Sequence, residues 1–116
     1  MNEFEKEIIS IITNAGDCRA HCYKALDYAD EGEYEEAEKE MELANDALGK
    51  AHVEQTQFLV KEARGEYIKC SILFVHAQDH LMTAISEKNL IERIVELRKV
   101  VNSLLASRSI EEVKEI

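Results

Sequence analysis

The sequence predicts an all-α protein that folds as an antiparallel up-down-up three-helix bundle. The 116 residues contain no proline and only four glycines, so long helices can run without a break. Apolar residues make up 46% of the chain, and they recur at alternating spacings of three and four, which gathers them on one side of a helix. Turns near Gly32 and Gly65 divide this pattern into three helical segments.

The first predicted helix runs from near Asn2 to near Asp30. Its apolar seam has a heptad-like spacing and consists of Phe4, Ile8, Ile11, Ala15, Cys18, Cys22, Ala25 and Ala29. Gly16 interrupts the pattern and weakens the helix by about 1 kcal/mol relative to alanine. We expect one continuous helix, and a glycine there could also permit a close helix approach.

The second predicted helix runs from about Tyr34 to about Ala63. Its seam repeats the spacing with Tyr34, Ala37, Met41, Ala44, Leu48, Ala51, Gln55 and Phe58. The many alanines in the seam let neighbouring helices approach closely. The glutamates between residues 35 and 42 form the solvated side of this helix.

The third predicted helix runs from about Tyr67 to about Ala106. A short charged tail follows from about residue 107, and it could add a last helical turn or fray. Its most apolar stretch splits into three stripes. One face contains Phe74, Ala77, Leu81 and Ala84, a second contains Ile72, Val75, Asp79, Met82 and Ser86, and a third, more polar one contains Leu73, His76, His80 and Thr83. An apolar seam continues through Leu90, Ile94, Leu97, Val101 and Leu104. Because a packed helix needs one apolar face, the second face predicts contact with another subunit.

Composition narrows the function classes for this single predicted domain of residues 1–116. The formal charge of −10 argues against nucleic acid, which needs a basic footprint. The same charge is a poor match to anionic membranes, and the longest apolar run is too short to span a bilayer. The start of the chain lacks the pattern of a signal peptide. An odd number of cysteines, two of them one helical turn apart, favours reduced thiols and a cytoplasmic location.

Two histidines, an aspartate and a glutamine interrupt the apolar stretch. His76 and His80 lie one helical turn apart, one above the other. The pair could bind a metal with at least one more ligand, although Asp79 lies on the neighbouring stripe. Alternatively, one imidazole could accept a phosphoryl group through its lone pair, with Gln78 or His80 donating hydrogen bonds to that group. The third interpretation is a structural role at a helix packing edge.

Asp79 raises a separate question because it interrupts the second apolar face. If subunits associate by rotational symmetry through this face, the carboxylate meets copies of itself. Like charges at close range must be protonated or bridged by a cation, and Mg²⁺ fits because it prefers hard oxygen ligands. The alternative is a buried acid with a local hydrogen-bond partner.

Residues 75–82 read Val-His-Ala-Gln-Asp-His-Leu-Met. This octapeptide resembles the signature of the lactose/cellobiose family of IIA components of the bacterial sugar phosphotransferase system. Weaker similarities occur in residues 11–16, 51–56 and 63–66, which resemble the family's first-helix pattern, its second-helix motif and the turn before its third helix. The resemblance covers residues 8–97, nearly the whole predicted domain.

The resemblance implies a phosphotransferase component that assembles as a homotrimer, a nine-helix bundle. His76 would accept a phosphoryl group from phospho-HPr on Nε2 and pass it to a cysteine of the cognate IIB component. Gln78 and His80 would border the phosphate, and Asp79 would lie on the threefold axis, where three subunits share one Mg²⁺. The sugar, a disaccharide of the cellobiose, lactose or chitobiose type, would meet only the membrane component IIC. The cysteines of this chain would carry no phosphate.

A non-catalytic helical peptide-binding module is the alternative. Residues 32–37, Gly-Glu-Tyr-Glu-Glu-Ala, resemble the turn of a tetratricopeptide repeat. Only one such unit is visible, whereas solenoids need about three repeats. This alternative also leaves the polar cluster at residues 76–80 unexplained.

Overall fold

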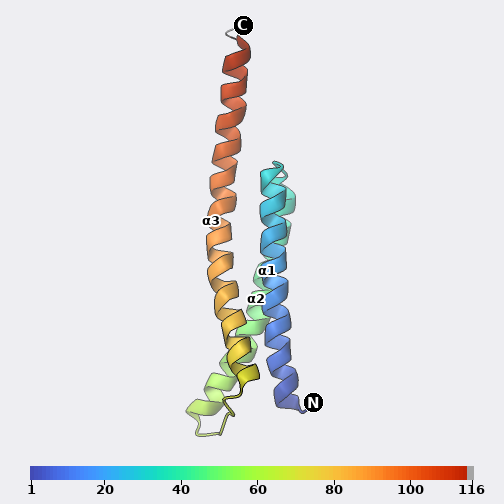
Figure 1. The fold of residues 1–116 in the computed structure, drawn as a ribbon, viewed down its shortest axis with the longest axis vertical. Coiled ribbons are helices and arrows are strands. Elements are labelled where there is room, and N and C mark those ends of the chain that lie inside the picture. Colours follow the sequence, from blue (N-terminus) through green and yellow to red (C-terminus); the bar gives the residue numbers. More distant parts are fainter. Residues whose placement is uncertain (115–116) are drawn as a thin grey trace.

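The computed structural model describes the backbone of residues 1–114 and the side chains of residues 1–108. It contains three helices, α1 (Glu3–Asp30), α2 (Tyr34–Ala63) and α3 (Ile72–Lys114). They run up, down and up in a body of 73 × 22 × 20 Å (Figure 1). The predicted all-α three-helix bundle is therefore confirmed for the described residues.

The ends of α1 and α2 follow local sequence signals. Asn2 caps α1, because its Oδ1 accepts a hydrogen bond of 2.8 Å from the backbone N–H of Glu5, as N-cap asparagines do. Both turns contain a glycine with a positive φ, +77° at Gly32 and +85° at Gly65. Left-handed backbone favours glycine because it has no Cβ.

The start of α3 differs from the prediction, which placed it near Tyr67. Residues 66–70 form no helix, and α3 begins at Ile72. Ser71 is the reason, because its Oγ accepts a hydrogen bond of 3.1 Å from the backbone N–H of Phe74 and so caps the helix. A serine before an apolar run is an N-cap signal. Our prediction gave more weight to the helical periodicity of the residues around it.

The end of α3 also differs. We predicted a helix end near Ala106 and a charged tail that could add a last helical turn or fray, whereas the helix continues to Lys114. No glycine or proline occurs in residues 107–114, so nothing in the local sequence stops the helix. The last two residues of the predicted tail, 115 and 116, lie outside the described residues.

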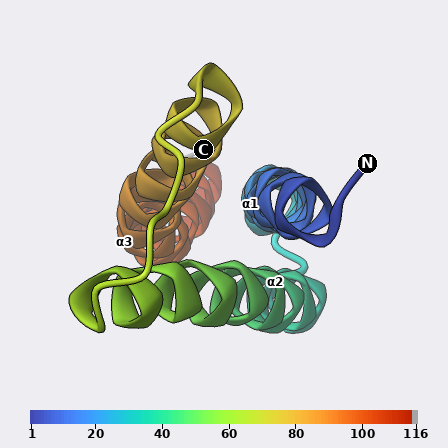
Figure 2. The same ribbon diagram turned by 90° about the horizontal axis from the view of Figure 1, so that it is seen from below.

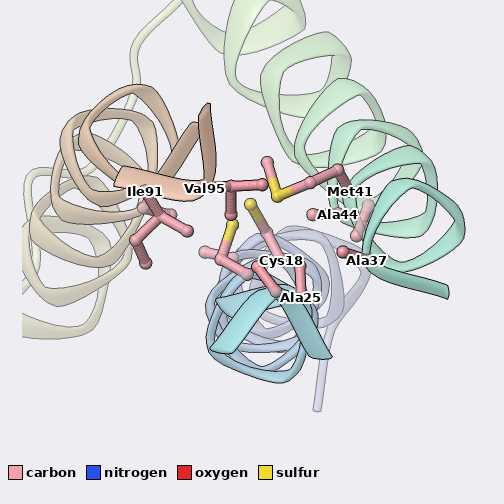
Figure 3. Packing of buried hydrophobic residues seen from close by; sticks show 12 residues of the cluster. Cys18, Ala25, Ala37, Met41, Ala44, Ile91 and Val95 are labelled. Atoms are coloured by element: carbon pink, nitrogen blue, oxygen red, sulfur yellow. The ribbon is translucent and has the colours of Figure 1, made fainter. Parts of the chain in front are cut away.

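The core divides into two clusters along the bundle. The lower one centres on three phenylalanines, one from each helix: Phe4, Phe58 and Phe74, whose ring centroids lie 5.3 to 6.3 Å apart. The upper one is built of alanines and sulfur-containing side chains. In Figure 3, Cys18 of α1, Met41 of α2 and Val95 of α3 point toward one another. Small residues at the crossing let the three backbones approach, as the alanine-rich seams predicted.

The two ends of the bundle are unlike. From below, α2 leans away from α1, and the segment that follows it leads from its end to the start of α3 (Figure 2). At the other end, α3 extends well beyond the turn that joins α1 to α2 (Figure 1). The aromatic cluster therefore closes the end where α3 begins, and the far end of α3 stands clear of the other two helices.

Candidate functional site

The buried face of α3 decides where the histidines point. Ala77 and Leu81 are 1% and 0% exposed and pack against the aromatic cluster. His76 and His80 each precede one of these residues, so their side chains leave the helix about 100° away from the buried face. His76 is exposed and His80 is half-buried. The pair thus lies along the edge of the packed face.

The two imidazoles form a hydrogen-bonded pair. Their Nε2 atoms lie 3.1 Å apart, and the rings meet edge to face with centroids 4.5 Å apart and planes at 88°. One ring must donate an N–H and the other must accept with its lone pair. His80 Nδ1 is buried and has no hydrogen-bond partner among the described residues. When the Nε2–H of His80 donates, the Nε2 of His76 is the nitrogen with the lone pair.

A pocket of about 260 Å³ opens beside this pair. Its lining residues come from two helices: Arg19 of α1, and His76, Asp79, His80 and Thr83 of α3. Arg19 binds Glu87 through two parallel hydrogen bonds of 2.9 Å, from Nε and from Nη2. This pair lowers the pKa of Glu87 and raises the pKa of Arg19, because each ion favours the charged form of the other.

Arg19 is a site residue that the sequence analysis missed. It reaches the pocket because α1 and α3 pack side by side, and no motif near residue 19 signals this. Thr83 carried a signal, since it shares the more polar stripe with both histidines.

Gln78 lies apart from the pocket. Its Oε1 accepts a hydrogen bond from the Nε2 of Gln55 on α2, and Gln55 is 6% exposed. Gln78 therefore joins α3 to α2, and it does not line the pocket in the single chain. His52 is also separate, since it is exposed on α2 and lines a different groove.

Asp79 is exposed on the second apolar face of α3. The interpretation of a buried acid with a local hydrogen-bond partner is therefore wrong for the single chain. No group of three or more His, Cys, Asp or Glu side chains in the described part of the chain could hold a metal ion. Asp79 offers one hard oxygen ligand, which suits Mg²⁺ only if other copies of the chain supply more.

The three thiols do not line this pocket. Cys18 and Cys22 are fully buried in the upper cluster, and Cys70 is exposed in the segment before α3. The hydrogen bond between the two buried thiols raises the pKa of Cys22, and burial raises it further. This thiol therefore stays protonated and unreactive.

Taken together, the fold and the site define a helical-bundle subunit that presents a paired imidazole beside an uncovered apolar face. The family model for the lactose/cellobiose-specific IIA subunit of the phosphotransferase system matches residues 6–99. The chain belongs to this family. The turn at Gly32, which resembles that of a tetratricopeptide repeat, joins helices of 28 and 30 residues. This turn is therefore not part of a repeat of short helices.

Three relatives illustrate the similarity. The lactose-specific EIIA component of Staphylococcus epidermidis is 41% identical over 101 residues, which cover 85% of this chain and 97% of the relative. The crystal structure of the cellobiose-specific enzyme IIA from Bacillus anthracis has a TM-score of 0.85 and 38% identity, and covers 89% of this chain and 94% of its own. The Escherichia coli IIA(chitobiose)–HPr complex has a TM-score of 0.73 and 33% identity, with 88% and 99% coverage.

A separate property concerns membranes. Among the described residues, no helix is both long enough and apolar enough to cross a bilayer.

Proposed function

We propose that the chain carries a phosphoryl group on His76, which it receives from phospho-HPr and passes to a cysteine of the cognate IIB component. The observation that supports this most directly is the open pocket in which His76 and His80 pair through their Nε2 atoms at 3.1 Å. The solved IIA(chitobiose)–HPr complex of a relative supports HPr as the donor. We expect the exchange to take place in the cytoplasm.

The proposed chemistry is two in-line displacements at phosphorus. The lone pair of His76 Nε2 attacks the phosphorus of phospho-HPr, a P–N bond to His76 forms, and the bond from phosphorus to HPr breaks with its electron pair leaving on HPr. The Nε2–H of His80, released from His76, donates to a phosphoryl oxygen. A thiolate of IIB then attacks the same phosphorus, and the electron pair of the P–N bond returns to Nε2.

Gln78 has a smaller part in this proposal than the resemblance implied. The Oε1 of Gln78 accepts a hydrogen bond from Gln55 within the chain. Only the amide N–H groups of Gln78 could then donate to a phosphate. We propose that it fixes the angle between α2 and α3 next to the pocket. His76 and His80 then remain the two groups that meet the phosphoryl group.

We further propose that three copies of the chain assemble through the second apolar face of α3. Asp79 lies in that face between exposed apolar residues, Val75 at 46% and Met82 at 47%. Threefold symmetry would bring three Asp79 carboxylates together, and a shared Mg²⁺ would neutralise their repulsion. The nine-helix bundle would also cover apolar surface that a monomer leaves in water.

The transported sugar belongs to the membrane partner in this proposal. Relatives named for lactose, cellobiose and chitobiose all resemble this chain at 33 to 41% identity. We propose that the chain supplies phosphoryl groups for uptake of a disaccharide of this type, and that the IIC component alone contacts the sugar.

Intact-mass spectrometry tests the phosphocarrier function. The chain is mixed with phosphoenolpyruvate, enzyme I and HPr at neutral to alkaline pH, because phosphohistidine is labile in acid. We expect the wild type and a control variant, His52→Ala, to gain one phosphoryl group, and His76→Ala to gain none. If reagents that are active on another IIA leave the wild type unmodified, the phosphocarrier proposal is wrong.

A further inference from the structure

The charges around the pocket pose a problem for a phosphoryl group. Among the five lining residues, Asp79 carries a negative charge and Arg19 carries the one permanent positive charge. Glu87 adds a second carboxylate one helical turn beyond Thr83. A phosphoryl group on His76 would add about two negative charges to the pocket. Without Arg19, the group would face two carboxylates and no fixed cation.

The way in which Arg19 binds Glu87 leaves it able to bind a second anion. A guanidinium has five N–H donors in one plane. Glu87 takes two of them, the Nε–H and one N–H of Nη2, at 2.9 Å each. The opposite edge, with two N–H groups on Nη1 and one on Nη2, stays available and has the spacing of two phosphate oxygens.

The Arg19 side chain is held in place and remains accessible to solvent. Arg19 and Glu87 side chains are 36% and 23% exposed, so the ion pair lies at the rim of the pocket. The two parallel hydrogen bonds to the Glu87 carboxylate fix the plane of the guanidinium.

We propose that Arg19 binds the phosphoryl group on His76 through its free edge, and that Glu87 is the positioning residue that orients it. This inference rests on the phosphocarrier function proposed above. Arg19 then comes from α1, whereas the acceptor comes from α3. The packing of these two helices assembles the phosphate site.

Substitution of Arg19 tests this role. In the phosphoenolpyruvate, enzyme I and HPr assay, we expect Arg19→Gln to lower the rate of phosphoryl transfer about 10- to 100-fold, the value of a charge-assisted hydrogen bond. Arg19→Lys should be about 3- to 10-fold slower than wild type, because a lysine cannot hold Glu87 and a phosphate in one plane. The matched control is Arg98→Gln, since Arg98 has similar exposure, 38%, and pairs with Asp30. It should transfer at the wild-type rate.

The ³¹P NMR resonance of the phosphohistidine gives a readout that a structural role would not move. It should shift in Arg19→Gln and stay in place in Arg98→Gln. A wild-type rate and resonance in both Arg19 variants would overturn the proposal. A wild-type rate in Arg19→Lys alone would overturn the part assigned to Glu87, because charge would then suffice. Should Arg19→Gln fail to fold by circular dichroism, Arg19→Met, which keeps a long side chain without the charge, replaces it in the same comparison.

Failure of this inference and failure of the phosphocarrier function are distinguishable. If the wild type gains no phosphoryl group, or His76→Ala still gains one, the phosphocarrier function has failed. If both behave as proposed and the Arg19 variants match wild type, only the role of Arg19 has failed.

Discussion

The two faces of α3 are both mainly apolar, although Asp79 and Ser86 interrupt the second, and they lie in opposite environments. On one face, Leu81 and Ala84 are fully buried against α1 and α2. On the other, Ile72 and Leu90 are 90% and 61% exposed. The histidine pair lies between these faces. Hydrophobicity along a helix therefore predicts how many of its faces need to be buried, and packing shows which face the chain itself covers.

The two faces of α3 differ most in the part of the helix that follows the histidine pocket. The predicted seam of residues 90–104 lies mostly on the uncovered side, and the core is reached instead by Ile91 and Val95. The buried face of this part of α3 contains a polar residue, which made it hard to predict from the sequence. Asn102 continues it, and its Nδ2 donates hydrogen bonds of 3.0 and 2.9 Å to the carbonyl of Ala29 and the hydroxyl of Tyr34. A half-buried amide whose hydrogen-bond partners are present is stable, but an asparagine in the sequence looks like a surface residue.

The largest stability effect should come from the covered face. Leu81→Ala should lower the free energy of unfolding by about 2–5 kcal/mol, because it leaves a cavity in the core. Urea unfolding monitored by circular dichroism measures this. Leu59→Ala makes the same chemical change at a leucine that is 57% exposed on α2, and it should change stability by about 0.5 kcal/mol or less. Equal effects would show that the two environments are not as different as the structure has them.

The uncovered face should respond in association and not in folding. Leu90→Glu should raise the dissociation constant of the proposed trimer more than tenfold, about 1.4 kcal/mol or more, because it buries a charge in the subunit contact. Sedimentation velocity over a range of concentrations measures the shift. Asn89→Glu adds the same charge at the neighbouring exposed position and should leave association nearly unchanged. A Leu90→Glu variant that associates like wild type would place the contact elsewhere.

Asp79 should respond in the opposite direction to Leu90. Asp79→Leu should keep or strengthen association, because it replaces repelling carboxylates with apolar surface. It should also remove any effect of chelating Mg²⁺, whereas EDTA should weaken association of the wild type. Sedimentation of both proteins with and without EDTA gives the four values to compare. Monomeric Asp79→Leu would contradict this account of the second face.

The smallest effect concerns the ion pair at the pocket rim. Arg19 lowers the pKa of Glu87 below its ordinary value of 4.5, so this pair stabilises the fold above that pH. The contribution is lost as the pH falls through the lowered pKa. We expect the wild type to lose up to about 1 kcal/mol more stability than Glu87→Gln between pH 7 and pH 3. Urea unfolding at both pH values tests this.

A second carboxylate provides the control for that measurement. Glu36 pairs with Lys39 at 3.3 Å, and its side chain is 50% exposed, so water screens this pair more. Glu36→Gln should therefore follow the pH dependence of the wild type more closely than Glu87→Gln does. Identical pH profiles for the wild type and Glu87→Gln would show that the ion pair adds nothing to folding.

Much of the fold could be predicted from the sequence because its signals are local. The three-four spacing and two glycine turns placed α1 and α2 with bounds that the structure confirms. The start of α3 was missed because the single hydroxyl of Ser71 outweighs the periodicity around it. The histidine pair could be predicted as well, since residues one turn apart on a helix meet whatever surrounds them.

The helices, the second apolar face and the octapeptide motif could all be found in the sequence. The structure was needed to show that Arg19 joins the histidine pocket, that Gln78 bonds to Gln55, and that Asp79 is exposed. These features depend on contacts between residues far apart along the chain. Periodicity relates residues within a few turns, whereas Arg19 and Glu87 are 68 positions apart and meet only because two buried faces bring α1 against α3.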